Sequence, residues 1–272
     1  TAERGEIVAS LRASEATIYE RFGYGPASVT VKVEVETARA RLRPNVASSE
    51  SAVRFVEPRN SWEMLARVYA GVTETGRVAR PQLWWNGQAS GANKNKDPLY
   101  VVAHGAPGAE DGYVRYHPTS VGPWFSSSER SIVVDDLVAQ TEEAYFGLLR
   151  FLFSVDLAHK LVFSKLPADH GLEKLLLDER AAKTVSTDDE TWLRLIDVAA
   201  ALSARTYRGT GTVTLAVTDE LLPANSGGYR ISASGIERTD DAPDLSLDVA
   251  TLATLYLGGT PWWQQARAGR VV

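Results

Sequence analysis

A tyrosine near the start of the chain, Tyr19, is the first side chain whose surroundings suggest chemistry. It lies in the segment SEATIYERFGYG, residues 14–25, between a helix-like run and a glycine–aromatic–glycine turn. A phenol has a pKa of about 10, so at neutral pH it stays protonated and donates a proton to a strongly basic group. A tyrosine beside a helix-ending glycine is more often structural, so a packing role and an acid role are both open at this point.

The elements around Tyr19 follow from the local pattern. Residues 6–13, EIVASLRA, predict a short buried strand, and the run SEATIYERF predicts a helix with Ser14 as its N-cap. Gly23 stands where a helix end favours a left-handed residue. A strand, a helix and a glycine turn would therefore hold the phenol in a fixed place.

The middle of the chain predicts a mixed α/β sheet. Its predicted strands are 28–36, 52–58, 98–104, 112–118, SIVVDDL and KLVFSKLP, with the pair 98–104 and 112–118 as a hairpin. Its predicted helices are 61–72, capped by Ser61, and one after SIVVDDL whose apolar face is Leu137, Val138, Ala144, Tyr145, Leu148, Leu149 and Leu152. Residues 87–97, GQASGANKNKD, are polar and rich in turn formers, which predicts a loop.

The pattern changes to a small α+β module in the last part of the chain. Its predicted elements are a helix over 197–207 capped by Asp197, strands over 211–217 and 228–235, and a strand and helix over 244–259. We expect the boundary to fall near 188–196.

Composition narrows the classes of function. Hydrophobic residues make up 44% of the 272 and charged residues 23%, as in proteins with a real core. A net charge of −5 argues against nucleic acid as the main partner. It is compatible with a cationic ligand, but it is also the ordinary mild acidity of many cytosolic proteins. Without cysteine there is no thiolate metal site and no cysteine nucleophile, and a reducing cytoplasm is the natural setting. The four histidines show no metal-binding spacing, no G-x-S-x-G is present, and no apolar run could span a membrane.

The string ASEATIYERFGYGPAS closely resembles the enhanced intracellular survival (Eis) family of aminoglycoside acetyltransferases in the GNAT superfamily. The resemblance continues in order along nearly the whole chain. It is carried by RPQLWW (80–85), DDLVAQTEEAYFGLLRFL, LLLDERAAKTV (175–185), WLRLIDVAAALSARTY (192–207) and DLSLDVATLATLYLGG.

The resemblance implies an α+β protein of three fused parts. Residues 1–27 look like the tail of an N-terminal GNAT domain, 28–190 like a central GNAT-like mixed α/β sheet domain, and 191–272 like a truncated sterol-carrier-like domain. Members of the family assemble as hexamers and acetylate several amines of aminoglycosides with acetyl-CoA. We therefore expect a homo-oligomer, acetyl-CoA as the acetyl donor and a small cationic amine as the substrate.

The resemblance also implies roles for particular residues. Tyr19 falls on the general-acid position, which protonates the departing thiolate. Ser14, beside the acetyl-CoA channel, would touch cofactor or amine, and Ile18 would lie near the pantetheine. Trp85 matches a tryptophan that walls the antibiotic pocket, with core packing as the alternative, and the adjacent Trp84 suits either role.

Two departures from the family pattern stand out. The family holds the pyrophosphate on an Arg-rich, glycine-containing loop that opens a helix, and the only basic cluster here, RARLRP (39–44), lies beyond the Tyr19 helix. The family also uses its terminal carboxylate as general base, a role that does not suit Val272, where this sequence stops. We expect a fragment of a longer enzyme, with a short protein that has lost catalysis as the alternative.

Two functions from different classes follow. The first is an acetyl-CoA-dependent N-acetyltransferase of aminoglycoside-like polyamines with Tyr19 as general acid. The second is a non-catalytic scaffold or lipid-binding module built on the GNAT-like and sterol-carrier-like parts. A long apolar cavity in the last module would favour lipid binding, and a filled interior would favour the scaffold.

Overall fold

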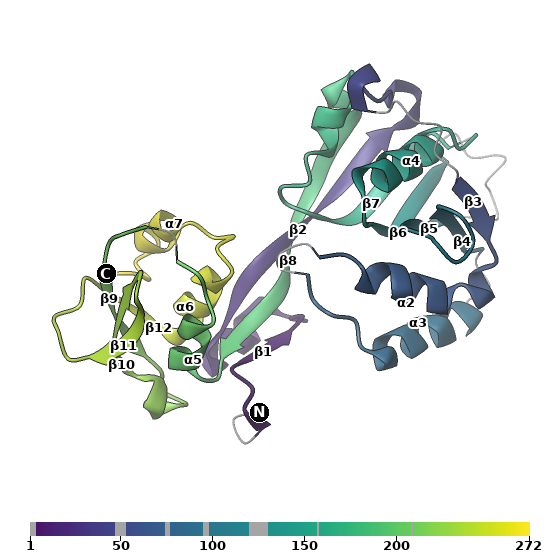
Figure 1. The fold of residues 1–272 in the computed structure, drawn as a ribbon. Coiled ribbons are helices and arrows are strands. Elements are labelled where there is room, and N and C mark those ends of the chain that lie inside the picture. Colours follow the sequence, from purple (N-terminus) through teal and green to yellow (C-terminus); the bar gives the residue numbers. More distant parts are fainter. Residues whose placement is uncertain are drawn as a thin grey trace. The chain divides into compact units, whose positions relative to one another are not determined.

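The computed structural model describes residues 4–46, 53–73, 77–94, 98–119, 130–156, 158–207 and 209–272. The chain divides into two compact units. The first unit comprises Thr1–Thr30 and Asp188–Val272, and the second comprises Val31–Thr187. Two long strands, β2 (Tyr24–Glu36) and β8 (Ala182–Leu195), contribute residues to both units (Figure 1). They also run across both boundaries expected from the sequence, and the three-part division stays a prediction.

The first unit holds the Tyr19 segment and a small four-stranded sheet. Its other elements are β1 (Val8–Leu11), α1 (Ala16–Tyr19), α5 (Val198–Ser203), β9 (Val213–Thr218), β10 (Gly227–Ser232), β11 (Gly235–Thr239), β12 (Leu245–Asp248), α6 (Val249–Tyr256) and α7 (Trp262–Arg267). The sheet order is β11-β10-β9-β12, in which β9 and β12 are parallel and the other pairs antiparallel. The backbone of Val272 pairs with Ser246 of β12, so the last residues extend this sheet.

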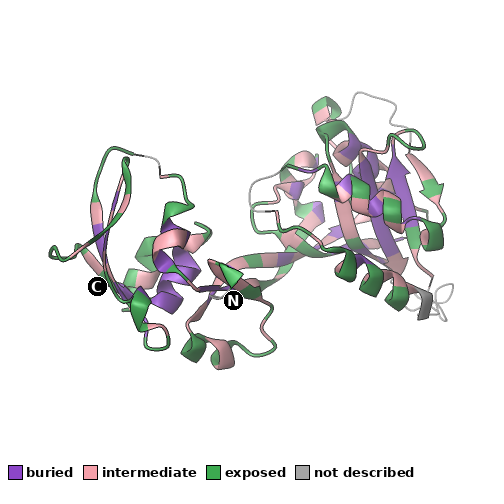
Figure 2. Cartoon of the chain, turned by 60° about the horizontal axis from the view of Figure 1, so that its bottom comes forward, coloured by how far each residue is buried: buried purple, intermediate pink, exposed green. Residues whose placement is uncertain are grey.

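The core of the first unit lies between this sheet and two helices. Buried residues from α5 and α6 pack on the sheet, as the purple positions in Figure 2 show. Each helix begins at an aspartate whose side chain accepts a backbone N–H of the first turn, Asp197 from Ala200 and Asp248 from Thr251. The predicted Asp197 cap is confirmed.

One buried ion pair crosses this unit. The Arg194 guanidinium of β8 donates to both carboxylate oxygens of Asp219, at 2.7 and 2.8 Å, and the two residues are 3% and 4% exposed. Asp219 also accepts from the Asn225 amide at 2.8 Å and from the backbone N–H groups of Leu221 and Leu222. Burial raises the pKa of this carboxyl, but its hydrogen bonds and the Arg194 charge outweigh burial, and the pKa is lowered.

The second unit is a mixed sheet with helices on both faces. Its elements, besides parts of β2 and β8, are β3 (Val53–Val56), α2 (Trp62–Ala70), α3 (Gln82–Lys94), β4 (Tyr100–His104), β5 (Gly112–Pro118), β6 (Ser131–Ala139), α4 (Glu142–Phe153) and β7 (Lys160–Pro167). The full strand order is β1-β8-β2-β7-β6-β5-β4-β3. β6 and β7 are parallel and α4 connects them, because a parallel pair needs a crossover rather than a tight turn.

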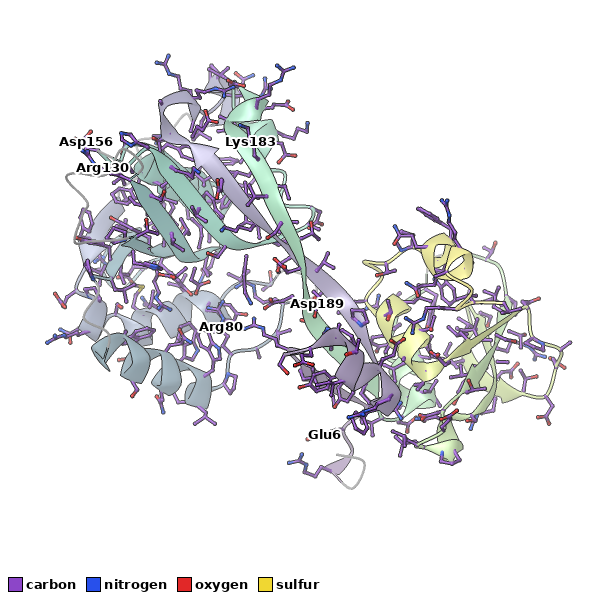
Figure 3. The ribbon with its side chains drawn as sticks, turned by 180° about the vertical axis from the view of Figure 1, so that it is seen from behind. Glu6, Arg80, Arg130, Asp156, Lys183 and Asp189 are labelled. Atoms are coloured by element: carbon purple, nitrogen blue, oxygen red, sulfur yellow. The ribbon has the colours of Figure 1, made fainter. Side chains whose placement is uncertain are left out.

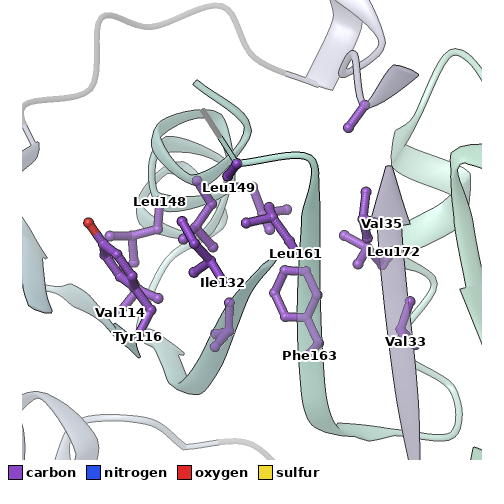
Figure 4. Close-up of a cluster of buried hydrophobic side chains, with 14 of the residues drawn as sticks. Val33, Val35, Val114, Tyr116, Ile132, Leu148, Leu149, Leu161, Phe163 and Leu172 are labelled. Atoms are coloured by element: carbon purple, nitrogen blue, oxygen red, sulfur yellow. The ribbon is translucent and has the colours of Figure 1, made fainter. Parts of the chain in front are cut away.

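Alternate residues of the strands face two separate cores. Val102 and Val114 face α4, where Leu148, Leu161 and other apolar residues complete the larger cluster (Figure 4). On the opposite face the neighbouring strand residues pack with α2 and α3; these residues are Val101, Tyr113 and Val138, against Leu65, Val68, Val72 and Trp85. Because successive side chains of a strand point to opposite faces of the sheet, the same strands supply both cores.

The mixed α+β fold class is confirmed, and so is the hairpin of β4 and β5, which pairs Tyr100 with Tyr116. Two local predictions for this unit are wrong, and one strand was missed. Leu137 and Val138 belong to β6 and not to the following helix, which begins at Glu142 because Thr141 caps it. Most of the loop expected over 87–97 belongs to α3, which continues to Lys94. The strand β8 was not predicted, because residues 182–189 are largely exposed and lack an apolar pattern.

A glycine substitution tests the close contact between β2 and α6. A Cβ at Gly25 would lie 2.1 Å from the Ala250 carbonyl oxygen and 2.8 Å from the Thr254 nitrogen, which are helix backbone atoms that cannot turn aside. We expect Gly25→Ala to lower the unfolding free energy by about 1–3 kcal/mol or more, measured by urea denaturation. Gly87→Ala is the control, because no heavy atom lies within 4 Å of its Cβ; equal effects of the two changes would contradict this contact.

The Asp219 carboxylate gives a pH-dependent prediction. Removing its charge by Asp219→Asn leaves a buried unpaired Arg194, so we expect a loss of about 3–5 kcal/mol near neutral pH. Because the folded pKa is lowered, the contribution is complete above the unfolded pKa of about 3.9 and is lost as pH falls through the folded value. Chemical denaturation at decreasing pH should show the two proteins converging in acid. The control Asp241→Asn removes an exposed partner of Arg230 and should cost at most about 1 kcal/mol; a constant difference for Asp219→Asn at all pH values would refute the assignment.

Candidate active site

Tyr19 is the last residue of the four-residue helix α1. A 3-10 turn over Glu20–Phe22 follows, and Gly23 ends it with φ of +77° while its N–H donates to the Glu20 carbonyl at 2.8 Å. The left-handed glycine is therefore confirmed. The Ser14 cap is wrong: Glu15 occupies the N-cap position with extended backbone and makes no side-chain capping bond, because the helix begins only at Ala16.

The Tyr19 ring is half-buried between two other aromatic rings. Its centroid lies 6.3 Å from that of Tyr24, edge to face, and 6.3 Å from that of Trp192 at a tilt of 54°. Trp192 is 3% exposed, and its indole N–H donates to Asp189 of the same strand, labelled in Figure 3. Such contacts restrict the orientation of the ring, which remains partly exposed. The Tyr19 hydroxyl makes no hydrogen bond to any residue within the described ranges.

Ser14 and Ile18 lie on the same short segment as Tyr19. Ser14 is exposed, and Ile18 is half-buried with its N–H bonded to the Glu15 carbonyl at 3.3 Å. Their predicted contacts with acetyl-CoA stay predictions. The segment brings the three predicted residues together, as expected for neighbours in sequence.

The basic side chains around α1 have partners within the protein. Arg12 pairs with Glu190, Arg270 pairs with Glu20, and the Arg21 guanidinium lies 4.9 Å from the Phe22 ring centroid. None of the three is arranged as an open cradle for a diphosphate. No diphosphate contact is therefore assigned to these three arginines.

Trp85 lies in the second unit and is 4% exposed. Its ring packs edge to face against Trp84, at 4.8 Å between centroids, and against Tyr69, at 5.9 Å. This burial matches the core-packing alternative, and the half-buried Trp84 is the more accessible of the two rings. A role of Trp85 as substrate wall stays a prediction.

Sequence reasoning missed a charged group beside these tryptophans. Arg80, labelled in Figure 3, donates to the Asp136 carboxylate at 2.5 and 3.1 Å, and Tyr113 donates its hydroxyl to the same group at 2.8 Å. The Arg80 guanidinium also lies over Tyr69 and Trp84, with its central carbon 3.9 and 4.5 Å from the ring centroids. The available signal was the pair of aspartates in the apolar strand SIVVDDL.

The hydrogen bonds among Arg80, Asp136 and Tyr113 hold these side chains in place and make Tyr113 a poor proton donor. Burial lowers the pKa of Arg80, but the hydrogen bonds and charge of Asp136 outweigh burial, so the pKa is raised. Burial and then the Asp136 charge raise the pKa of the Tyr113 phenol. A phenol held in this way gives up its proton less readily than a free one.

Comparisons with known proteins identify two domains. Residues 76–195 match the family described as acetyltransferase (GNAT) domain, and residues 198–272 match the sterol carrier protein domain. The chain is also similar to a solved structure, described as the crystal structure of Eis1 from Mycobacterium abscessus. The two sequences are 44% identical, the TM-score is 0.92, and the match covers 100% of this chain and 69% of the other.

Two curated relatives give the same picture. An uncharacterized N-acetyltransferase of Streptomyces coelicolor is 33% identical over 277 residues, which cover 98% of this chain and 66% of the relative. N-acetyltransferase Eis of Mycobacterium tuberculosis is 31% identical over 271 residues, which cover 94% of this chain and 63% of the relative. The chain thus spans about two thirds of the length of these relatives. From the two domains and from the identity along its whole length, the chain belongs to the Eis-like N-acetyltransferases.

Proposed function

We propose that the protein transfers the acetyl group of acetyl-CoA to an amine of an aminoglycoside-like polyamine, with Tyr19 as the general acid. The observation that carries the proposal is the place of Tyr19 in an Eis-like chain. Its phenol stands half-buried at the end of α1, between Tyr24 and Trp192, and is followed by the left-handed Gly23. A fixed, partly exposed phenol is what proton donation to a leaving group requires.

The chemistry of the residue follows from its charge state. Acetyl-CoA, when bound, supplies an acetyl group activated as a thioester. Attack by a neutral amine on the carbonyl breaks the carbon–sulfur bond, and Tyr19 gives its proton to the sulfur that leaves. A phenol with its ordinary pKa of about 10 is protonated at neutral pH. The nitrogen that gains the acetyl group releases one proton to water, and the Tyr19 phenolate takes one back from water.

The remaining predicted residues take supporting roles in this proposal. Exposed Ser14 would touch cofactor or amine near the start of α1, and Ile18 would offer an apolar side chain to the pantetheine. Trp85 stays the candidate for an aromatic substrate contact, and the adjacent Trp84 is the more exposed of the two rings. No general base is assigned to this chain.

A cationic acceptor suits the charge of the protein. At −5 the chain attracts polyamines, and an aromatic face stabilises an ammonium by about 0.5–2 kcal/mol. No helix within the described ranges is long and apolar enough to cross a membrane. Assembly as a hexamer and a cytoplasmic location stay predictions.

The second candidate function is that of a scaffold, and one observation favours it for part of the chain. The backbone of α6, in the sterol carrier protein domain, lies directly against Gly25 beside the Tyr19 segment. A domain that supports this segment has a structural task whether or not it carries a lipid.

Exchange of Tyr19 for phenylalanine tests the acid. Full-length Tyr19→Phe keeps the ring and its aromatic contacts but loses the proton, so we expect turnover to fall on the order of 10²-fold or more. Thiol release from acetyl-CoA with kanamycin as acceptor is the measurement. Tyr24→Phe makes the same change on the neighbouring ring and should leave turnover near the wild-type value. Wild-type turnover in Tyr19→Phe would reject the acid assignment, and no thiol release by the wild type would reject the enzyme.

A further inference from the structure

The turn after Tyr19 rests on a buried arginine. A Cβ at Gly23 would lie 2.7 Å from the central guanidinium carbon of Arg194 and 2.8 Å from its Nε, so the guanidinium is in contact with the Gly23 backbone. Arg194 also donates to the Leu195 carbonyl at 3.0 Å. The planar guanidinium of Arg194 therefore occupies the space that a side chain at residue 23 would need.

The arginine is itself held by the sterol carrier protein domain. Arg194 lies at the end of the GNAT match, whereas Asp219 and Asn225 lie in the sterol carrier match, and all three belong to the first unit. Asn225 accepts from the first N–H of α5, that of Val198, and donates to Asp219, so the carboxylate has a fixed direction. A buried carboxylate with this many donors holds the guanidinium in one position.

Further contacts of the same domain surround the segment. Arg270 pairs with Glu20 in the turn after Tyr19, and its Nε donates to Thr251 of α6 at 3.1 Å. The backbone of α6 excludes any side chain at Gly25. The Arg194 guanidinium, which Asp219 holds, excludes a side chain at Gly23, and the α6 backbone excludes one at Gly25.

We propose that the sterol carrier protein domain positions Tyr19 for proton transfer, through the Arg194 guanidinium that Asp219 holds against Gly23. Arg194 is a positioning residue, because it touches the turn and not the reacting atoms. The proposal rests on the proposed role of Tyr19 as acid. A helix of four residues cannot hold its own geometry, since the first turn alone is unfavourable in water.

The informative variant is Arg194→Lys. Lysine keeps a positive charge for Asp219, but it has one nitrogen in place of the planar fork and cannot also cover Gly23. We expect amide hydrogen exchange over residues 16–24 to become on the order of tenfold faster, while exchange in the core of β9 and β10 stays unchanged. In the full-length protein, kcat should fall on the order of tenfold and the KM for acetyl-CoA should stay within about twofold.

The control is Arg230→Lys. Arg230 lies in the same domain and pairs with Glu237 and Asp241 at the surface, so this change should alter neither exchange over 16–24 nor kcat. A second test is a double-mutant cycle with Gly23→Ala. If the guanidinium occupies the space of the new Cβ, Gly23→Ala should cost less stability in Arg194→Lys than in the wild type.

The outcomes separate the two proposals. Unchanged exchange over 16–24 in Arg194→Lys, or additive effects in the cycle, would overturn the positioning role regardless of activity. Faster exchange with an unchanged kcat would overturn its catalytic part. If Tyr19→Phe remains fully active while Arg194→Lys speeds exchange over residues 16–24, the acid assignment fails. The contact of Arg194 with the Gly23 turn then has a structural role only.

Discussion

The guanidinium of Arg194 is buried in the first unit, and its positive charge requires a buried negative partner. A guanidinium removed from water loses its hydration, and this loss is offset only by an opposite charge with good hydrogen-bond geometry. Asp219 supplies that charge and is itself saturated by Asn225 and two backbone N–H groups. The loop after β9, the start of α5 and the end of β8 must therefore keep one arrangement. The turn that follows Tyr19 lies against this arrangement and takes its position from it.

The second unit also contains an arginine–aspartate ion pair, Arg80–Asp136, whose arginine is packed against aromatic rings. Arg80 and Asp136 are bonded at two points, yet the Arg80 guanidinium is enclosed by rings instead of by backbone. Aromatic faces tolerate a cation and leave its edge free for the carboxylate. Trp85 is packed beneath this group, which explains why a residue expected at a ligand wall is 4% exposed.

The sequence predicted features whose cause is local. Gly23 was predictable because a helix end favours a left-handed residue, and the hairpin of β4 and β5 because two strand-like segments bracket a turn rich in glycine and proline. What it could not predict depends on partners far along the chain. Arg194 and Asp219 are 25 residues apart, and neither position shows a pattern that marks it as buried. The exposed half of β8 has no apolar periodicity, and α3 carries Gly87 and Gly91 in a polar run that resembles a loop. In the pair Trp84–Trp85, neighbouring helix positions point about 100° apart, and the sequence alone does not say which one faces the core.

The short length of α1 gives a reason for combining the two domains in one chain. Isolated helices below about 12 residues are marginal in water, so the geometry of a four-residue helix must come from its contacts. The Tyr19 ring at its end contacts Tyr24 and Trp192. The residues that follow contact the Arg194 guanidinium at Gly23 and the α6 backbone at Gly25, and these two contacts depend on the sterol carrier protein domain. What this segment requires of the domain is a rigid outer surface at α6 and at the Asp219 loop. A lipid-sized cavity contributes nothing to that surface, so the domain can support Tyr19 whether its interior is open or filled.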